Sequence, residues 1–219
     1  GENKRAREFN AKYSITTDIY TDNNNYRLPL WYMEIDWHNT GLGVADYDRT
    51  IDKLWNKGQY KVEDVRFKKF CITVFNNPEG TRINMLEALQ EYGEVDCYGR
   101  PFGNWFKTDG SYKDKIVKLE GYAFNLCPEN SYYPGYYTEK CVHAKLAGSI
   151  PIYMADPLLR IDFRSQAMLN IYDYESARAL SKTANDIFKN KERLCDMLNE
   201  PLLSRKPNIN EFYKWLKYT

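Results

Sequence analysis

The stretch KFCITVFNNPEGTRINMLEALQEYGEVDCYG, residues 69–99, changes its apolar period twice, and these changes indicate the fold class. Its first part, KFCITVF, is apolar and rich in strand-forming residues, and the Asn, Pro and Gly of NNPEG end it as a turn. The next part repeats apolar side chains at helical spacing, with Thr81 as the expected N-cap and Gly93 as the stop. EVDCYG then predicts a second strand, so the stretch is a strand–helix–strand unit.

The same alternation continues along the chain. Further strands are expected at AFNLC (123–127), SIPIYM (149–154) and AMLNIYD (167–173), and helices at residues 111–122 and 138–148. Strands that alternate with helices through short connections are typical of a parallel, doubly wound sheet. The predicted fold class is therefore α/β.

Two regions lie outside this alternation. The first 65 residues are polar and irregular apart from a short helix expected at residues 46–58, and we expect connecting structure or part of another domain there. The stretches 174–203 and 208–218 have a helical pattern and would pack across a neighbouring domain.

Composition limits the function classes. The 31 Lys and Arg residues nearly balance the 30 Asp and Glu residues, so no overall field favours duplex DNA or an anionic membrane, and a phosphate must be held locally. The 19 tyrosines suit flat, amphipathic ligands such as sugars and nucleobases, or else follow from a biased genome composition. The five cysteines are widely spaced, which predicts buried free thiols rather than zinc ligands.

No apolar run reaches the ~18 residues that span a bilayer, and no signal sequence is visible. These features and the unpaired cysteines favour the cytoplasm. The chain begins at Gly1 without an initiator Met, so we expect it to be part of something longer, and a preceding segment could carry an anchor.

Two loops at predicted strand-to-helix turns stand out as sites for chemistry. NNPEGTR (76–82) carries Arg82 at the start of a helix, and PENSYYPGYYTEK (128–140) carries Lys140 behind Thr138, the expected N-cap. A cation at a helix N-terminus makes a compact anion site, for which a pyrophosphate is the natural ligand. Two alternatives stay open: Glu139 alone neutralises a solvated Lys140, and Arg82 is an ordinary surface residue.

Other candidate sites have weaker patterns. Asp46-Tyr47-Asp48 has the spacing with which some glycosyltransferases hold a divalent ion, but Asp is also an ordinary cap before an amphipathic run. His38 and His143 lack ligand spacing, and we expect His143 to be packed within its helix. The absence of a Walker loop, of GxGxxG and of GxSxG argues against a nucleoside triphosphatase, a dinucleotide oxidoreductase and a serine hydrolase.

The loop and its flanks, FNLCPENSYYPGYYTEKCVHAKLAGSIPIYM, resemble the donor-binding signature of the α-1,3/4-fucosyltransferases, glycosyltransferase family 10. The residues at the family's spacing are Glu129-Asn130, Tyr136, Thr138-Glu139-Lys140 and Pro151. FNNPEGTRINMLEAL is similar to a further family segment with Arg82 at its donor-binding arginine, and NNNYRLPLWY and the opening GEN also resemble family segments. The resemblance covers almost the whole chain and is closest to the bacterial type.

The resemblance implies a two-domain GT-B glycosyltransferase that moves L-fucose from GDP-fucose to a sugar hydroxyl with inversion. Arg82 and Lys140 would hold the diphosphate, and Asn130 and Tyr136 would add hydrogen bonds to the donor. Glu139 would contact the ribose or the fucose near the developing positive charge, and Glu2 matches the proposed general base. GDP-fucose is the donor substrate, and neither a metal nor another cofactor is required.

The resemblance also implies a domain division. Because a substantial region precedes GEN in the family, we expect residues 1–65 to be the end of the acceptor domain with its linker. Residues 66–186 would form the Rossmann-like donor domain, and residues 187–219 the C-terminal helices.

Several functions stay open beside the transferase. The acceptor would be an oligosaccharide containing N-acetylglucosamine or glucose, with an α-1,3 linkage. A GDP-sugar-binding module without turnover, a transferase of another GDP-sugar, and a Rossmann-like domain of unrelated use are the alternatives. A bacterial protein would lie in the cytoplasm or at the cytoplasmic face of the membrane, with peripheral association left open, and a eukaryotic one in the Golgi lumen.

Overall fold

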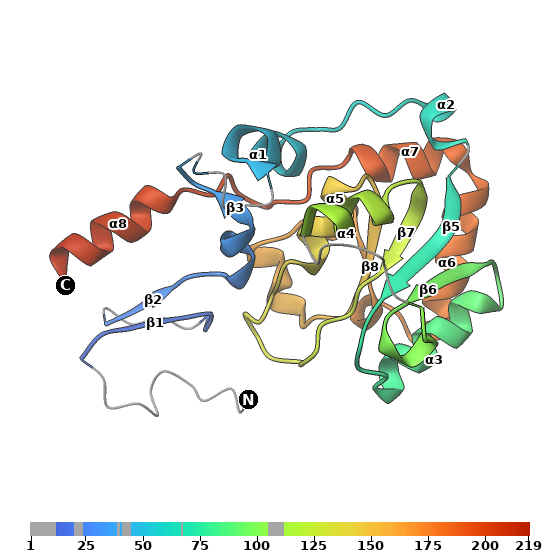
Figure 1. The fold of residues 1–219 in the computed structure, drawn as a ribbon, viewed down its shortest axis with the longest axis horizontal. Helices are drawn as coiled ribbons and strands as arrows, with labels where there is room; N and C mark the ends of the chain where they lie inside the picture. Colours follow the sequence, from blue (N-terminus) through green and yellow to red (C-terminus); the bar gives the residue numbers. More distant parts are fainter. Residues whose placement is uncertain (1–11, 20–23, 39, 41–44, 67, 105–111) are drawn as a thin grey trace.

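A five-stranded parallel sheet forms the centre of the computed structural model (Figure 1). The structure describes residues 12–19, 24–38, 40, 45–66, 68–104 and 112–219. The strand order is β6-β5-β7-β8-β9, and every neighbouring pair is parallel. The bounds are β5 Lys69–Val74, β6 Val95–Tyr98, β7 Tyr122–Leu126, β8 Ile150–Tyr153 and β9 Leu169–Asn170. The predicted α/β class and all five predicted strands are confirmed.

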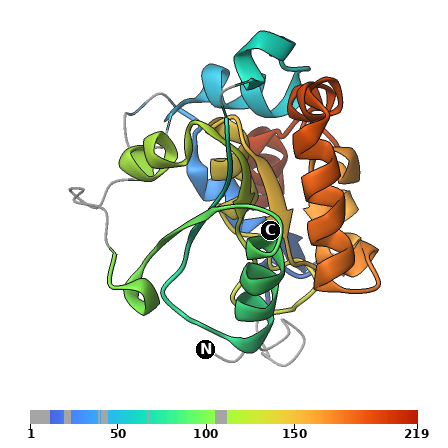
Figure 2. The ribbon, with the colours of Figure 1, turned by 90° about the vertical axis from the view of Figure 1, so that its right-hand side faces the viewer.

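Helices cover both faces of this sheet (Figure 2). One face carries α3 (Gly80–Gln90), α6 (Ala177–Lys189) and α7 (Lys191–Asn199), and the other carries α4 (Tyr112–Leu119) and α5 (Lys140–Leu146). The neighbouring β5 residues Cys71 and Ile72 belong to the cores on opposite faces, because successive side chains of a strand point to opposite faces. Coverage on both faces explains why these strands are continuous apolar runs in the sequence.

The order of the strands creates a reversal between β5 and β7. The chain passes from β5 through α3 to β6 at the edge, then returns through α4 to β7 on the other side of β5. In open α/β sheets, ligands bind beyond the carboxyl ends of the strands at such a switch point.

Two expected helix caps are wrong. The N-cap of α3 is Glu79 rather than Thr81, since the helix begins two residues earlier than expected, at Gly80. The N-cap of α5 is Glu139 rather than Thr138, because the Thr138 hydroxyl donates to a buried carboxylate instead of accepting a helix N–H. The predicted stop at Gly148 follows the end of α5, with φ +68°.

The segment before the sheet contains short elements. Its strands are β1 (Ser14–Thr16), β2 (Asn25–Arg27), β3 (Ile35–Asp36) and β4 (Ala45–Asp46), and its helices are η2 (Leu30–Glu34), α1 (Tyr47–Trp55) and α2 (Val62–Val65). The predicted helix at 46–58 corresponds to α1, whereas α2 was not predicted. The division at residues 65 and 186 stays a prediction.

The remaining elements include the C-terminal helix and short 3-10 turns. Helix α8 (Ile209–Tyr218) lies beside β1 and β2, away from the sheet (Figure 1), and Phe212 and Trp215 pack on Tyr26 of β2. The 3-10 turns are η3 (Arg100–Phe102), η4 (Pro157–Ile161), η5 (Ser165–Ala167) and η6 (Ile171–Asp173).

A buried ion pair joins the N-terminal segment to the sheet domain. Arg27 donates through both terminal nitrogens to Asp162, at 2.9 and 2.7 Å, and the Trp31 indole N–H donates to the same carboxylate at 3.1 Å. The Asp162 side chain is only 2% exposed, so its charge depends on these donors.

We predict that Arg27→Met lowers the free energy of unfolding by about 3–5 kcal/mol, because it leaves a buried carboxylate without its cation. Urea unfolding measures the change. Arg160→Met is the matched control: its pair with Asp173 has side chains 58% and 36% exposed, and the expected loss is about 0–1 kcal/mol. Equal losses in the two variants would contradict a special role of the buried pair.

Histidine 143 joins the same segment to α5 and predicts a pH dependence of stability. Its ring is fully buried, and Nε2 lies 2.9 Å from Oε2 of Glu34. Burial lowers the pKa of His143 and outweighs the opposing hydrogen bond from Glu34, and nearby Lys115 also disfavours the charged ring. The predicted packed role of His143 is confirmed.

We expect stability to fall as the pH drops below about 6.5, because the unfolded chain then binds a proton that folded His143 does not. Urea midpoints at about pH 7.5 and about pH 5.5 measure this loss. His143→Gln should reduce the difference between the two midpoints, while His38→Gln, at an exposed position, should keep it. The same pH dependence in all three proteins would refute the assignment.

Candidate functional site

A cleft of about 330 Å³ opens at the carboxyl ends of β5 and β7, where the strand order reverses. Its walls are residues 74–77 at the end of β5, Arg82 of α3, Lys115 of α4, Asn130 and Glu139 of the loop between β7 and α5, and Lys140 at the start of α5. Both loops singled out in the sequence therefore meet in one cleft, because parallel strands end at the same edge of a sheet.

Arg82 ties the two loops together. Its guanidinium donates to the backbone oxygens of Asn77 and Glu129, each at 2.8 Å, and to Oδ1 of Asn130. The residue is 2% exposed, so the alternative of a surface arginine is wrong. Burial lowers the pKa of Arg82 despite Glu79 and Glu129, yet an arginine stays charged at neutral pH.

Glu129 is the centre of the hydrogen bonds behind the cleft. It is fully buried and accepts from the Thr138 backbone N–H at 2.8 Å, the Thr138 hydroxyl at 2.9 Å and the Tyr153 hydroxyl. Lys140 Nζ donates to it at 2.8 Å. The sequence places Glu129 in the motif without indicating its role, although a carboxylate so close to the end of a buried strand needs partners.

Lys140 is held mainly by Glu129. Its Nζ lies 2.8 Å from Glu129 but 3.8 Å from Glu139, so the alternative in which Glu139 alone neutralises a solvated Lys140 is wrong. Burial lowers the pKa of Lys140, but Glu129 and Glu139 outweigh it and raise the value above the usual one. The side chain is 18% exposed, which leaves a charged ammonium group at the wall of the cleft.

Glu139 stays ionised in this setting. Burial alone would raise its pKa, but Lys140 and Lys115 outweigh burial and lower the pKa to about 2. The carboxylate is therefore an acceptor and a source of negative charge, and not a general acid. Lys115 was missed by the sequence analysis, because nothing in the pattern of its helix marks which lysine faces the cleft.

The profile of glycosyltransferase family 10 (fucosyltransferase), C-terminal part, matches residues 65–216. The chain belongs to this family. The matched region contains the sheet and the whole cleft, so the predicted family resemblance is confirmed.

Known family members are similar over different lengths. The alpha-(1,3)-fucosyltransferase FucT of Helicobacter pylori is 32% identical over 242 residues, which covers 100% of this chain and 49% of that protein. The 4-galactosyl-N-acetylglucosaminide 3-alpha-L-fucosyltransferase 9 of Bos taurus is 30% identical over 135 residues, covering 60% of this chain and 36% of that protein. The chain thus spans less than half the length of these relatives.

A solved structure has the same fold. The crystal structure of an alpha1,3-fucosyltransferase with GDP-fucose superposes with a TM-score of 0.75 at 21% sequence identity, covering 100% of this chain and 72% of that chain. The predicted GT-B type of the family-10 chain is thereby confirmed.

Four of the predicted site residues line the cleft, and the others do not or lie outside the described residues. Arg82, Asn130, Glu139 and Lys140 line the family-10 cleft together. Tyr136 is not among the lining residues. Glu2 lies outside the described residues, and so do the side chains of the Asp46-Tyr47-Asp48 motif.

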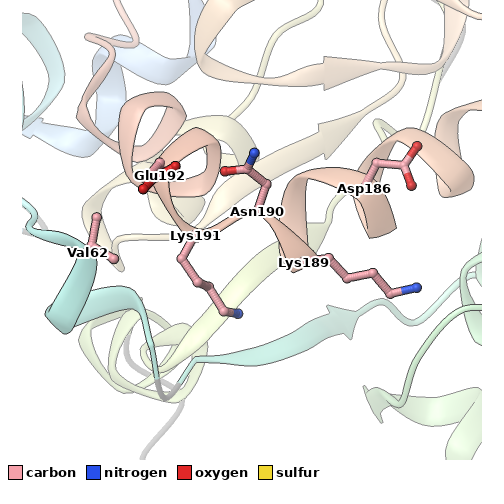
Figure 3. A pocket seen from close by; sticks show the side chains of 6 residues that line it. All are labelled: Val62, Asp186, Lys189, Asn190, Lys191 and Glu192. Atoms are coloured by element: carbon pink, nitrogen blue, oxygen red, sulfur yellow. The ribbon is translucent and has the colours of Figure 1, made fainter.

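Other features offer no comparable site in the described part of the family-10 chain. A second hollow of about 500 Å³ lies where α6 meets α7, near α2, and is lined by Asp186, Lys189, Lys191 and Glu192, among others (Figure 3). Two cations and two anions there give no net charge for a ligand to complement. The described residues contain no cluster of three metal-ligating side chains and no helix able to cross a membrane. All five cysteines are free thiols, four of them buried, as predicted apart from the half-buried Cys97.

We predict that Glu129→Gln destabilises the protein by about 2–3 kcal/mol, because hydrogen bonds to a charged group are lost and Lys140 loses its nearest anion. Urea unfolding gives the difference. Glu87→Gln, on the exposed side of α3, is the control and should stay within about 0.5 kcal/mol of the parent. A Glu129 variant as stable as this control would show that the buried carboxylate is dispensable.

Proposed function

We propose that this chain binds GDP-fucose and transfers L-fucose, with inversion, to a hydroxyl of an oligosaccharide that contains N-acetylglucosamine. The observation that carries the proposal is the convergence of Arg82, Asn130, Glu139 and Lys140 in one cleft of a family-10 member. The names of the relatives, which are 3-alpha-L-fucosyltransferases, support fucose as the sugar and α-1,3 as the linkage.

The donor diphosphate would lie against Arg82 and Lys140. Both side chains are already oriented by protein acceptors, so little reorganisation is needed when negative charge develops on the leaving group. The bond from the anomeric carbon to the diphosphate oxygen breaks, and the electron pair leaves with GDP. Two fixed cations can supply this stabilisation without a resident metal.

The sugar would lie near Glu139, whose carboxylate stays ionised beside a centre that gains positive charge. Asn130 and Tyr136 would add hydrogen bonds to the donor. Glu2 would take the proton from the acceptor hydroxyl as that oxygen attacks the anomeric carbon, a role that rests on the GEN motif.

A GDP-sugar-binding protein without turnover is the second candidate. It is favoured by the fact that the residues gathered in the cleft, Arg82, Asn130, Glu139 and Lys140, are all on the proposed donor side and could bind a GDP-sugar without an acceptor. Another GDP-sugar would bind equally well, because Arg82 and Lys140 would contact the diphosphate and not the sugar.

We expect calorimetric titration to show GDP binding, weakened about tenfold or more in Lys140→Ala, because a charge in contact with a diphosphate is removed. Arg82→Lys should weaken binding as well, since lysine lacks the planar guanidinium that can donate two parallel hydrogen bonds to a phosphate. Lys118→Ala is the control on α4, outside the cleft lining.

The catalytic step is tested by release of GDP from GDP-fucose with a galactose–N-acetylglucosamine disaccharide, with GDP-mannose as the competing donor. Transfer supports the enzyme, whereas GDP binding without transfer supports the binding protein. A folded parent that does not bind GDP contradicts both.

A further inference from the structure

Lys115 is a third cation of the cleft and has no role in the function proposed above. It lies on α4, between β6 and β7, and lines the cleft with Arg82 and Lys140. Its Nζ is 3.5 Å from Oε1 of Glu139, and the two side chains are 23% and 24% exposed. The pair is thus partly withdrawn from water at the wall of the cleft, where charges interact more strongly than at a free surface.

The charges at this wall alternate. Lys115 is paired with Glu139, Glu139 lies 3.8 Å from Lys140, and Lys140 is paired with Glu129 at 2.8 Å. Each lysine therefore has a carboxylate neighbour before any ligand is bound. Arg82 adds a further positive charge, and its acceptors are neutral oxygens.

Counting these side chains shows what Lys115 changes. Among the charged side chains that are not exposed, Arg82 and Lys140 set against Glu129 and Glu139 give two positive and two negative charges, a net charge of zero; Glu79, which also acts on Arg82, is exposed and screened by water and salt. Lys115 makes the sum one positive charge. A neutral wall would not favour a diphosphate, which carries at least two negative charges, and Glu139 alone would repel it.

We propose that Lys115 is a further positioning residue of the cleft, which holds Glu139 in place and neutralises it so that a carboxylate and a nucleoside diphosphate can occupy the same cleft. This inference rests on the proposed function, because it assumes a diphosphate as the ligand. The two lysines then have different roles. Lys140, which is paired with Glu129, contacts the ligand, and Lys115 compensates the negative charge of Glu139.

A purely structural salt bridge would behave differently. A partly exposed pair of this kind contributes little to stability, and if its role were only structural, removal of either member would leave ligand affinity unchanged. A charge-setting role predicts that removal of both members of the pair restores ligand affinity, because the net charge of the cleft returns to its original value.

The test compares the parent with Lys115→Met, Glu139→Gln and the double variant, whose cleft charges by the same count are plus one, zero, plus two and plus one. The probe for charge is inorganic pyrophosphate, which has no sugar or base, and the second probe is GDP. Calorimetry at about 50 mM and about 300 mM salt separates electrostatic from other contributions.

We expect Lys115→Met to bind pyrophosphate about tenfold more weakly than the parent at low salt, Glu139→Gln to bind it several-fold more tightly, and the double variant to lie within about threefold of the parent. The differences should shrink at high salt. Lys115→Arg should retain the parent affinity, and the control Lys118→Met, whose ammonium lies over the Tyr98 ring, should change nothing.

Parent-like pyrophosphate affinity in Lys115→Met, or a double variant as weak as Lys115→Met, would overturn the proposal. A parent that binds pyrophosphate but not GDP would refute the proposed function while the comparison of variants still decides the role of Lys115. A parent that binds neither would refute both.

Discussion

The buried carboxylate of Glu129 is the constraint on which the cleft depends. A carboxylate taken out of water is costly unless donors surround it, and here Thr138, Lys140 and Tyr153 supply them. Two of these donors lie nine and eleven residues further along the same loop, and the third comes from β8. Satisfying one charge therefore closes the loop and fixes where Asn130 and Glu139 face the cleft.

The same arrangement orients the cations before a ligand arrives. Lys140 is held by Glu129, and Arg82 is held by the oxygens of both loops, so neither needs to lose much rotamer freedom on binding. This orientation of the cations has a cost, because each carboxylate near a lysine offsets positive charge that would otherwise attract the ligand. The number of cations relative to anions, rather than the presence of any single lysine, then decides what the cleft attracts.

The sequence was sufficient for the parts of the molecule that follow from local periodicity. It predicted the five strands and the meeting of Arg82 with Lys140, because parallel strands end at one edge whatever their order. It could not predict Lys115 or the partner of Lys140, since these depend on how helices and loops pack in space. Contacts between distant residues, such as Arg27 with Asp162, leave no trace in a local pattern.

The segment before the sheet packs against the loop between β7 and α5, on the side of the loop away from Glu129. Gly135 has φ +93°, and a Cβ there would lie 2.1 Å from the Thr17 carbonyl oxygen. Both the backbone conformation and the lack of space for a side chain therefore require glycine. The neighbouring Tyr133 hydroxyl donates to Asp18 at 2.6 Å, and the Tyr137 carbonyl accepts from the Trp31 N–H at 3.2 Å. The loop is thus held between Glu129 and the segment before the sheet. These contacts couple the segment before the sheet to the cleft-lining residues Asn130 and Glu139 through a single loop.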